Sequence, residues 1–168
     1  MLPFLSRQPH MSLPERFAGS LATTRLNPTG GDQSMRLVSC RLERGPAATS
    51  RVSVEFEGPA ESQRIRCQQE GSACSGGDLR LAALATLNAI AQATGGALTF
   101  ELIGVKPVRA FDTTVMMLAV FARLGGTVTR IVGVAIVEDD QLVATARAAL
   151  HASRLLSSPL LDQLPFVG

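Results

Sequence analysis

The chain has 168 residues, of which 46% are hydrophobic, and a formal net charge of +2 at pH 7. This length provides one sizeable core and is too short for two ordinary domains. The sixteen Lys and Arg residues form no basic run, and the chain has no Trp or Tyr, so we expect no nucleic-acid partner.

Cysteine and histidine usage bounds the chemistry and the compartment. Cys40, Cys67 and Cys74 are odd in number and lack Cys-x-x-Cys spacing, so we expect reduced cysteines in or near the core of a cytoplasmic protein. No apolar run is long enough to predict a membrane span, and the start of the chain lacks the pattern of a signal peptide. The two histidines, His10 and His151, are too few for a zinc site or a nucleophilic triad. We therefore expect no metal, no cofactor and no catalytic residue, and we expect His151 to face solvent.

Residues 1–33 differ in composition from the rest of the chain. Several prolines and the Gly30–Gly31 pair interrupt any regular element there. We interpret the segment as a flexible N-terminal arm. The alternative is an arm that embraces a partner subunit through Phe4, Leu5 and Phe17.

Three strand patterns and a helix follow the arm. Met35–Glu43 and Gln63–Gln69 show partial alternation, whereas Arg51–Glu57 alternates cleanly and predicts a half-buried strand with one wet face. Asp78–Thr94 carries apolar residues at helical spacing. Asp78 is expected as its N-cap, and Gly95–Gly96 as its stop.

The same order then recurs. Ala97–Val105 alternates before Pro107, which is expected to end the strand, and Thr113–Arg123 is apolar on both faces. Gly125 and Gly126 predict a tight hairpin into a strand over Thr127–Val137. A final helix is expected near Asp140–Leu156, with acidic residues at its positive end.

The repeated order predicts an α+β fold of two β-β-β-α repeats over residues 34–158, followed by a C-terminal tail at 159–168. Two antiparallel sheets related by pseudo-two-fold symmetry, each covered by its helix, are expected; the alternative is one merged sheet with both helices on one side. The second repeat's middle strand is apolar on both faces and needs cover on both. We expect a second copy to supply it, giving a homodimer through Val115, Met117 and Phe121.

The most site-like segment is the Gly-rich connection Gly71–Asp78, which leads into the first helix. Free N–H groups at a helix start can hold an anion, so Ser75, Gly76, Gly77 and Asp78 are candidate ligand-binding residues for a carboxylate or phosphate. The alternative is a plain strand-to-helix connection. The spacing matches neither a P-loop nor a dinucleotide fingerprint.

The last helix carries a family resemblance. Residues 144–152 read Ala-Thr-Ala-Arg-Ala-Ala-Leu-His-Ala. With the repeated element order, this resembles the C-terminal regulatory (dimerisation) domain of 2-isopropylmalate synthases, whose closing helix runs Ala-Ser-Ala-basic-Ala-x-Leu-x-Ala. The resemblance covers about residues 35–157. It departs before the first helix, where the family has a Gly-x-Gly-x-Gly-Pro-like loop and this chain has Ser75–Asp78 without a proline.

The resemblance implies a stand-alone, non-catalytic, homodimeric regulatory module that binds a small-molecule effector or a protein partner, because the chain is too short for the family's catalytic barrel. Two arginine sets define the alternatives. A small oligomeric enzyme would clamp a carboxylate substrate at a subunit boundary with Arg109, Arg123 and Arg130. A nucleic-acid-binding surface would need one patch made of Arg36, Arg64 and Arg66.

Overall fold

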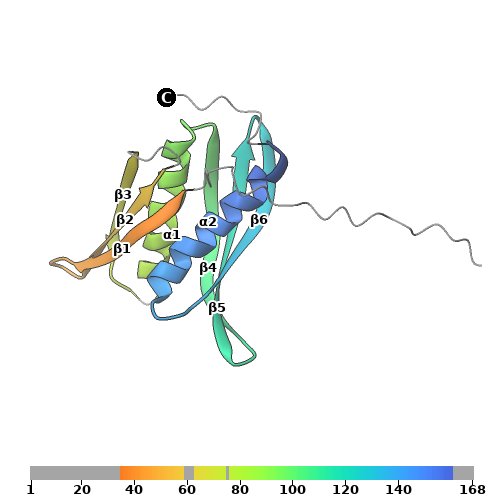
Figure 1. Cartoon of the computed structure of the whole chain (residues 1–168). Coiled ribbons are helices and arrows are strands. Elements are labelled where there is room, and N and C mark those ends of the chain that lie inside the picture. The colour runs from red at the N-terminus through yellow and green to blue at the C-terminus, as the bar shows by residue number, and fades with distance from the viewer. Residues whose placement is uncertain (1–34, 59–62, 75, 161–168) are drawn as a thin grey trace, which may run out of the picture. The chain divides into compact units, whose positions relative to one another are not determined.

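The computed structural model of the chain describes residues 35–58, 63–74 and 76–160, so the predicted arm over 1–33 lies outside the described residues. Within them, three strands and a helix are followed by three more strands and a second helix (Figure 1). In chain order they are β1 (Arg36–Arg44), β2 (Thr49–Glu57), β3 (Arg64–Ser72), α1 (Gly77–Ala93), β4 (Leu98–Ala110), β5 (Thr113–Leu124), β6 (Thr127–Ile136) and α2 (Gln141–Leu160).

The strands form two separate antiparallel sheets, ordered β1-β2-β3 and β4-β5-β6. The predicted fold of two β-β-β-α repeats is therefore confirmed, and the alternative of one merged sheet is wrong. The β5–β6 turn has the predicted form, because Gly125 and Gly126 adopt φ values of 55° and 88°, which suit a tight hairpin.

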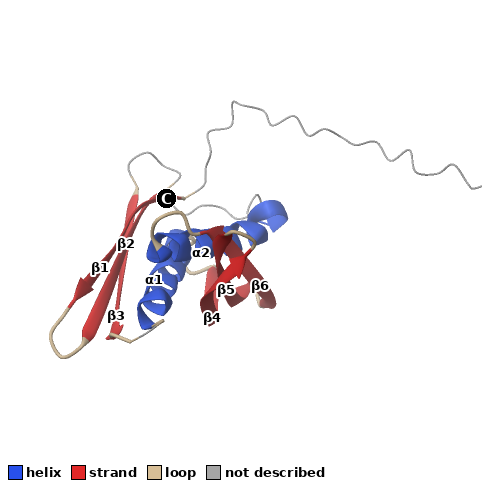
Figure 2. Cartoon of the chain, turned by 90° about the horizontal axis from the view of Figure 1, so that it is seen from below, coloured by secondary structure: helices blue, strands red, loops and turns tan. Residues whose placement is uncertain are grey.

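The two helices lie between the two sheets (Figure 2). α1 packs on β2 and β3 of its own repeat and on β4 of the other. α2 packs on β5 and β6 of its own repeat and on β1 of the other. The same contacts recur with the repeats exchanged, as a pseudo-two-fold axis produces, and each helix therefore joins the two repeats.

Burial between two sheets explains why both helices are rich in alanine. A helix with apolar neighbours on several sides has little room for large side chains. Alanines that are 0% exposed occur in both helices. They are Ala82, Ala83, Ala85 and Ala89 in α1 and Ala146, Ala148, Ala149 and Ala152 in α2.

The hairpin between β4 and β5 is longer than predicted. β4 continues through Pro107 to Ala110, so the expectation that Pro107 ends the strand is wrong. β4 is an edge strand of its sheet, where a residue without an N–H group is tolerated. The hairpin projects beyond the two helices (Figure 1), and Phe111 in its turn is 99% exposed.

The helix starts differ from each other. α1 has Gly76 at its N-cap and no side-chain capping bond, so the prediction that Asp78 caps it is wrong. Asp78 lies in the first turn of α1 instead, where its negative charge suits the positive end of the helix dipole. At α2, the Asp140 Oδ1 accepts a hydrogen bond of 2.7 Å from the Leu142 amide, which supports the predicted acidic start.

Two single-residue expectations are also corrected. His151 is half-buried rather than facing solvent, and its Nδ1 accepts a 3.1 Å hydrogen bond from the Val134 amide of β6, an edge strand. Cys67 is buried and Cys40 is half-buried, as expected, but Cys74 is exposed.

In the described part of the chain, no helix is both long enough and apolar enough to cross a membrane.

Candidate functional site

The predicted ligand-binding segment borders a cavity of about 450 Å³ at the amino ends of both helices. Gly76 and Asp78 line it, Gly77 lies between them, and Ser75 lies outside the described residues. The lining residues are Leu42, Arg44, Ala73, Cys74, Gly76, Asp78, Leu79, Gln141 and Leu142. β1, the β3–α1 connection, α1 and α2 therefore all contribute to this cavity, which we call the helix-start cavity.

Charges of both signs line the helix-start cavity. The Arg44 guanidinium donates two hydrogen bonds to the Asp78 carboxylate, of 3.1 and 2.7 Å. It also donates a 2.6 Å hydrogen bond to the hydroxyl of Ser50, which is 0% exposed. Arg44 therefore fixes the first turn of α1 to the first sheet. A ligand with a carboxylate would meet this arginine, and one with an ammonium would meet Asp78.

Glycine at position 77 fits the close packing of the turn into α1. The Gly77 amide donates a 2.9 Å hydrogen bond to the Cys74 carbonyl, and a Cβ atom at Gly77 would lie 2.6 Å from the Cys74 Sγ. Gly77 thus has a structural reason within the turn, as the alternative of a plain strand-to-helix connection predicts. Cys74 is exposed and lines the helix-start cavity, so the reactivity of its thiol reports whether a ligand occupies the cavity.

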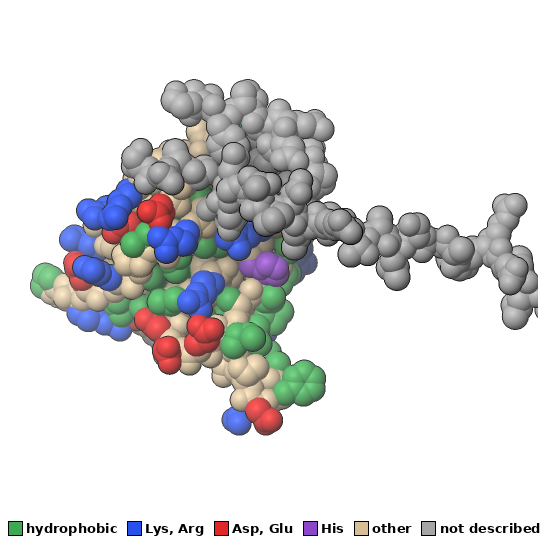
Figure 3. All heavy atoms as spheres, viewed as in Figure 1, with side chains coloured by type: hydrophobic (Ala, Val, Ile, Leu, Met, Phe, Trp, Pro, Cys, Tyr) green, Lys and Arg blue, Asp and Glu red, His purple; other side chains and the backbone are tan. Residues whose placement is uncertain are grey.

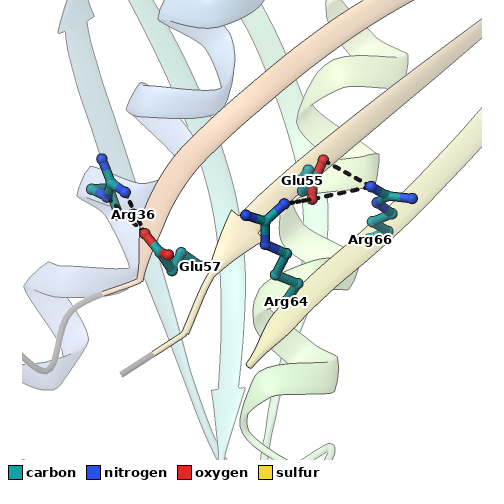
Figure 4. Close-up of polar contacts among 5 residues, drawn as sticks. All are labelled: Arg36, Glu55, Glu57, Arg64 and Arg66. Atoms are coloured by element: carbon teal, nitrogen blue, oxygen red, sulfur yellow. Dashed lines mark hydrogen bonds and ion pairs between the residues drawn. The ribbon is translucent and has the colours of Figure 1, made fainter. Parts of the chain in front are cut away.

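The outer face of the first sheet, away from the helices, is held by ion pairs. Arg36 pairs with Glu57, while Arg64 and Arg66 both pair with Glu55, at 3.1 and 3.2 Å (Figure 4). The hydrogen bond from Arg66 is the largest cause that lowers the pKa of Glu55 below its ordinary value. The three arginines required for a nucleic-acid surface are therefore paired with carboxylates and do not form an uncompensated basic patch.

The outer face of the second sheet is mainly apolar on β5 and β6 and carries charges as well, with Lys106 and Glu101 on β4, Arg123 on β5 and Arg130 on β6. Val115, Met117 and Phe121, the predicted dimer residues, lie on alternate positions of β5 and share this face, where Phe121 is 39% exposed. Each is paired in register with a residue of β6. β6 adds four exposed apolar side chains to the same face: Val128, Val132, Val134 and Ile136.

The β6 contribution was not predicted, although the sequence carries a signal for it. Apolar residues occupy four of the five even positions from 128 to 136, and the odd positions face the helices at Ile131 and Gly133. Alternation alone did not reveal which side the helices cover, because Ile131 on the covered side is also apolar.

A second cavity, of about 330 Å³, lies on this outer face where β4 begins and β5 ends. We call it the Phe121 cavity. It is lined by Thr99, Phe100, Glu101, Phe121, Arg123 and Val128. Its lining is thus partly apolar and includes one acidic and one basic residue.

The three arginines of the enzyme alternative are divided by the structure. Arg123 lines the Phe121 cavity, and Arg130 lies on the same face, opposite Phe121 on β6. Arg109 pairs with Thr114 at the far end of the β4–β5 hairpin. The set does not gather in one pocket of a single copy.

No protein-family model matches the chain, and no curated protein matches it. Among the described residues, no group of three or more His, Cys, Asp or Glu side chains is arranged to hold a metal ion.

Proposed function

We propose that this chain is a non-catalytic, homodimeric regulatory module similar to the C-terminal domain of 2-isopropylmalate synthases. It binds a small metabolite or a protein partner in the cytoplasm, which agrees with its unpaired cysteines. The observation that carries the proposal is the difference between the outer faces of the two sheets. One is covered by ion pairs, and the other exposes valine, isoleucine and phenylalanine side chains on β5 and β6, with charged residues mostly on β4 and at one end.

The size of the apolar face suits a second copy of the chain. Three strands about 4.8 Å apart and about 12 residues long give an outer face of about 14 by 40 Å, or about 560 Å². The part formed by β5 and β6 is mainly apolar. A stable interface buries about 800 Å² per partner, which is of the same order. Burying this apolar surface contributes about 25 cal/mol per Å², and part of that offsets the cost of association. The polar face of the first sheet offers no comparable gain.

The dimer is tested by placing the same charge on each of the two outer faces. Sedimentation velocity over a concentration series is expected to show a dimer for the natural chain. Met117→Lys places a charge on the apolar face of β5 and is expected to give a folded monomer, whereas Ser53→Lys on β2 of the other sheet is the matched control and stays dimeric. A natural chain that remains monomeric at high concentration contradicts the proposal.

The helix-start cavity is the site we propose for the effector. Arg44 and Asp78 provide charges of both signs beside the apolar walls formed by Leu42 and Leu142, a combination that suits a small amino or 2-keto acid.

The effector site is tested through Cys74. A bound amino or 2-keto acid is expected to raise the melting temperature and to slow the reaction of the Cys74 thiol with a maleimide. Arg44→Gln is expected to abolish both effects. Arg80→Gln, on the exposed side of α1, is the control and keeps them. No shift and no protection with any acid of a metabolite panel removes the small-molecule form of the proposal. Co-purification of a protein from the source organism then supports the partner form.

A further inference from the structure

The turn of the β4–β5 hairpin carries an unusual residue. Phe111 and Asp112 form a two-residue connection between the paired Ala110 and Thr113. Phe111 adopts a φ of 53°, a conformation that Gly, Asn and Asp adopt far more readily than a bulky residue. Its side chain is 99% exposed. Neither the turn nor packing within one copy accounts for a phenylalanine at this position.

The Phe121 cavity lies at the opposite end of the same sheet. Phe111 precedes the start of β5, and Phe121 and Arg123 lie near its end. Ten residues separate Phe111 from Phe121, which is about 33 Å along an extended strand. A phenylalanine therefore cannot reach this cavity within its own copy.

A two-fold dimer brings the two ends together. If two copies pack through the outer faces of their second sheets with the β5 strands antiparallel, a two-fold axis near Met116–Met117 exchanges the turn of one copy with the cavity of the other. This axis lies halfway between Phe111 and Phe121. Each dimer then contains two identical contacts, one at each end of the interface.

The charges of the turn and the cavity are complementary. Beside Phe111 the turn carries the acidic Asp112. Figure 3 shows an apolar and an acidic side chain at the end of this hairpin. Glu101 and Arg123 line the cavity. Within the described part of the chain, no ion pair involves Asp112, Glu101 or Arg123.

We infer that in the homodimer Phe111 of each copy inserts into the Phe121 cavity of the other, with Asp112 facing Arg123 of that copy. The inference rests on the proposed homodimer and names its contacts. Within one copy no aromatic side chain fills the cavity, and in the dimer Phe111 of the second copy does. The free energy cost of the positive φ at Phe111 is offset by the contact that its side chain makes with the other copy.

The first test separates the side chain from the turn. Phe111→Asn removes the aromatic ring and suits a positive φ, so it is expected to leave each copy as stable as before or more so, while the dimer dissociation constant from sedimentation rises about tenfold or more. Leu155→Ala truncates another exposed apolar side chain, on α2, and is the matched control with an unchanged dissociation constant.

The second test exchanges charges between the copies. Asp112→Arg and Arg123→Asp are each expected to weaken the dimer, and the double variant is expected to regain most of the lost affinity. These residues lie at opposite ends of β5, so such a rescue requires contact between copies. A dimer whose dissociation constant is unchanged by Phe111→Asn and by both charge variants overturns the inference and leaves the homodimer standing. A monomeric natural chain overturns both.

Discussion

Gly133 shows how closely the last helix approaches the second sheet. A Cβ atom at this position would overlap the Ala148 carbonyl oxygen and lie 2.8 Å from the Ala152 Cβ. Both contacted residues lie in α2, where Ala148 and Ala152 are 0% exposed. The absent side chain of Gly133 and the small side chains of Ala148 and Ala152 therefore allow the helix backbone to lie against β6.

Gly133→Ala is expected to lower the free energy of unfolding by about 1–3 kcal/mol, because the helix must move away from the strand to make room for the methyl group. Gly104→Ala is the matched control, since a Cβ atom at Gly104 has no neighbour within 4 Å. Urea denaturation at a low protein concentration measures the free energy of unfolding of both variants without a contribution from association. Equal losses for the two variants would contradict the close approach of α2.

Cys40 makes folding sensitive to alkaline pH. Burial, followed by the nearby Asp140 carboxylate, raises the pKa of the Cys40 thiol from 9.0 to about 11. Between these values the thiol ionises in the unfolded chain and stays protonated in the folded one, so its contribution to stability is complete below about pH 9 and is lost as the pH rises toward 11. In a background of Cys67→Ala and Cys74→Ala, the stability difference between Cys40 and Cys40→Ala is expected to narrow over that range. A difference that stays constant would show that the thiol titrates alike in both states.

At the scale of elements, local patterns predicted each helix and strand, and distant contacts decided where the predictions failed. The alternation of β2 and the Gly95–Gly96 pair after α1 act within a few residues, and both were interpreted correctly. Pro107 was taken as a strand end because the sequence does not show that β4 is an edge strand.

For the candidate sites too, local patterns were predictable from the sequence and contacts between distant residues were not. A strand that is apolar at both odd and even positions can be recognised in the sequence. We therefore predicted that Val115, Met117 and Phe121 share an exposed face, and in the structure they do. Asp78 was assigned as a cap because its partner, Arg44, lies 34 residues earlier in the chain. The cavities were not predictable, because each combines residues of elements whose packing is visible only in the fold.

At the scale of the whole described fold, neither repeat is complete by itself. α1 packs on β4 of the second repeat, and α2 packs on β1 of the first. A chain cut at the Gly95–Gly96 turn leaves one sheet with one helix in each piece. Each helix then exposes the side that the other repeat covers, and so small a layer buries too little apolar surface to offset its loss of conformational entropy.

Residues 35–96 and 97–160, produced separately, are therefore each expected to lack a cooperative thermal transition in circular dichroism. Mixed in equal amounts, they are expected to assemble and to recover one, because each supplies the strand that the other's helix requires. The undivided segment 35–160 is the control for the full transition. If one piece alone melts cooperatively as a monomer, the cross-packing of the helices is not needed for folding, and the repeats are independent units joined by a turn.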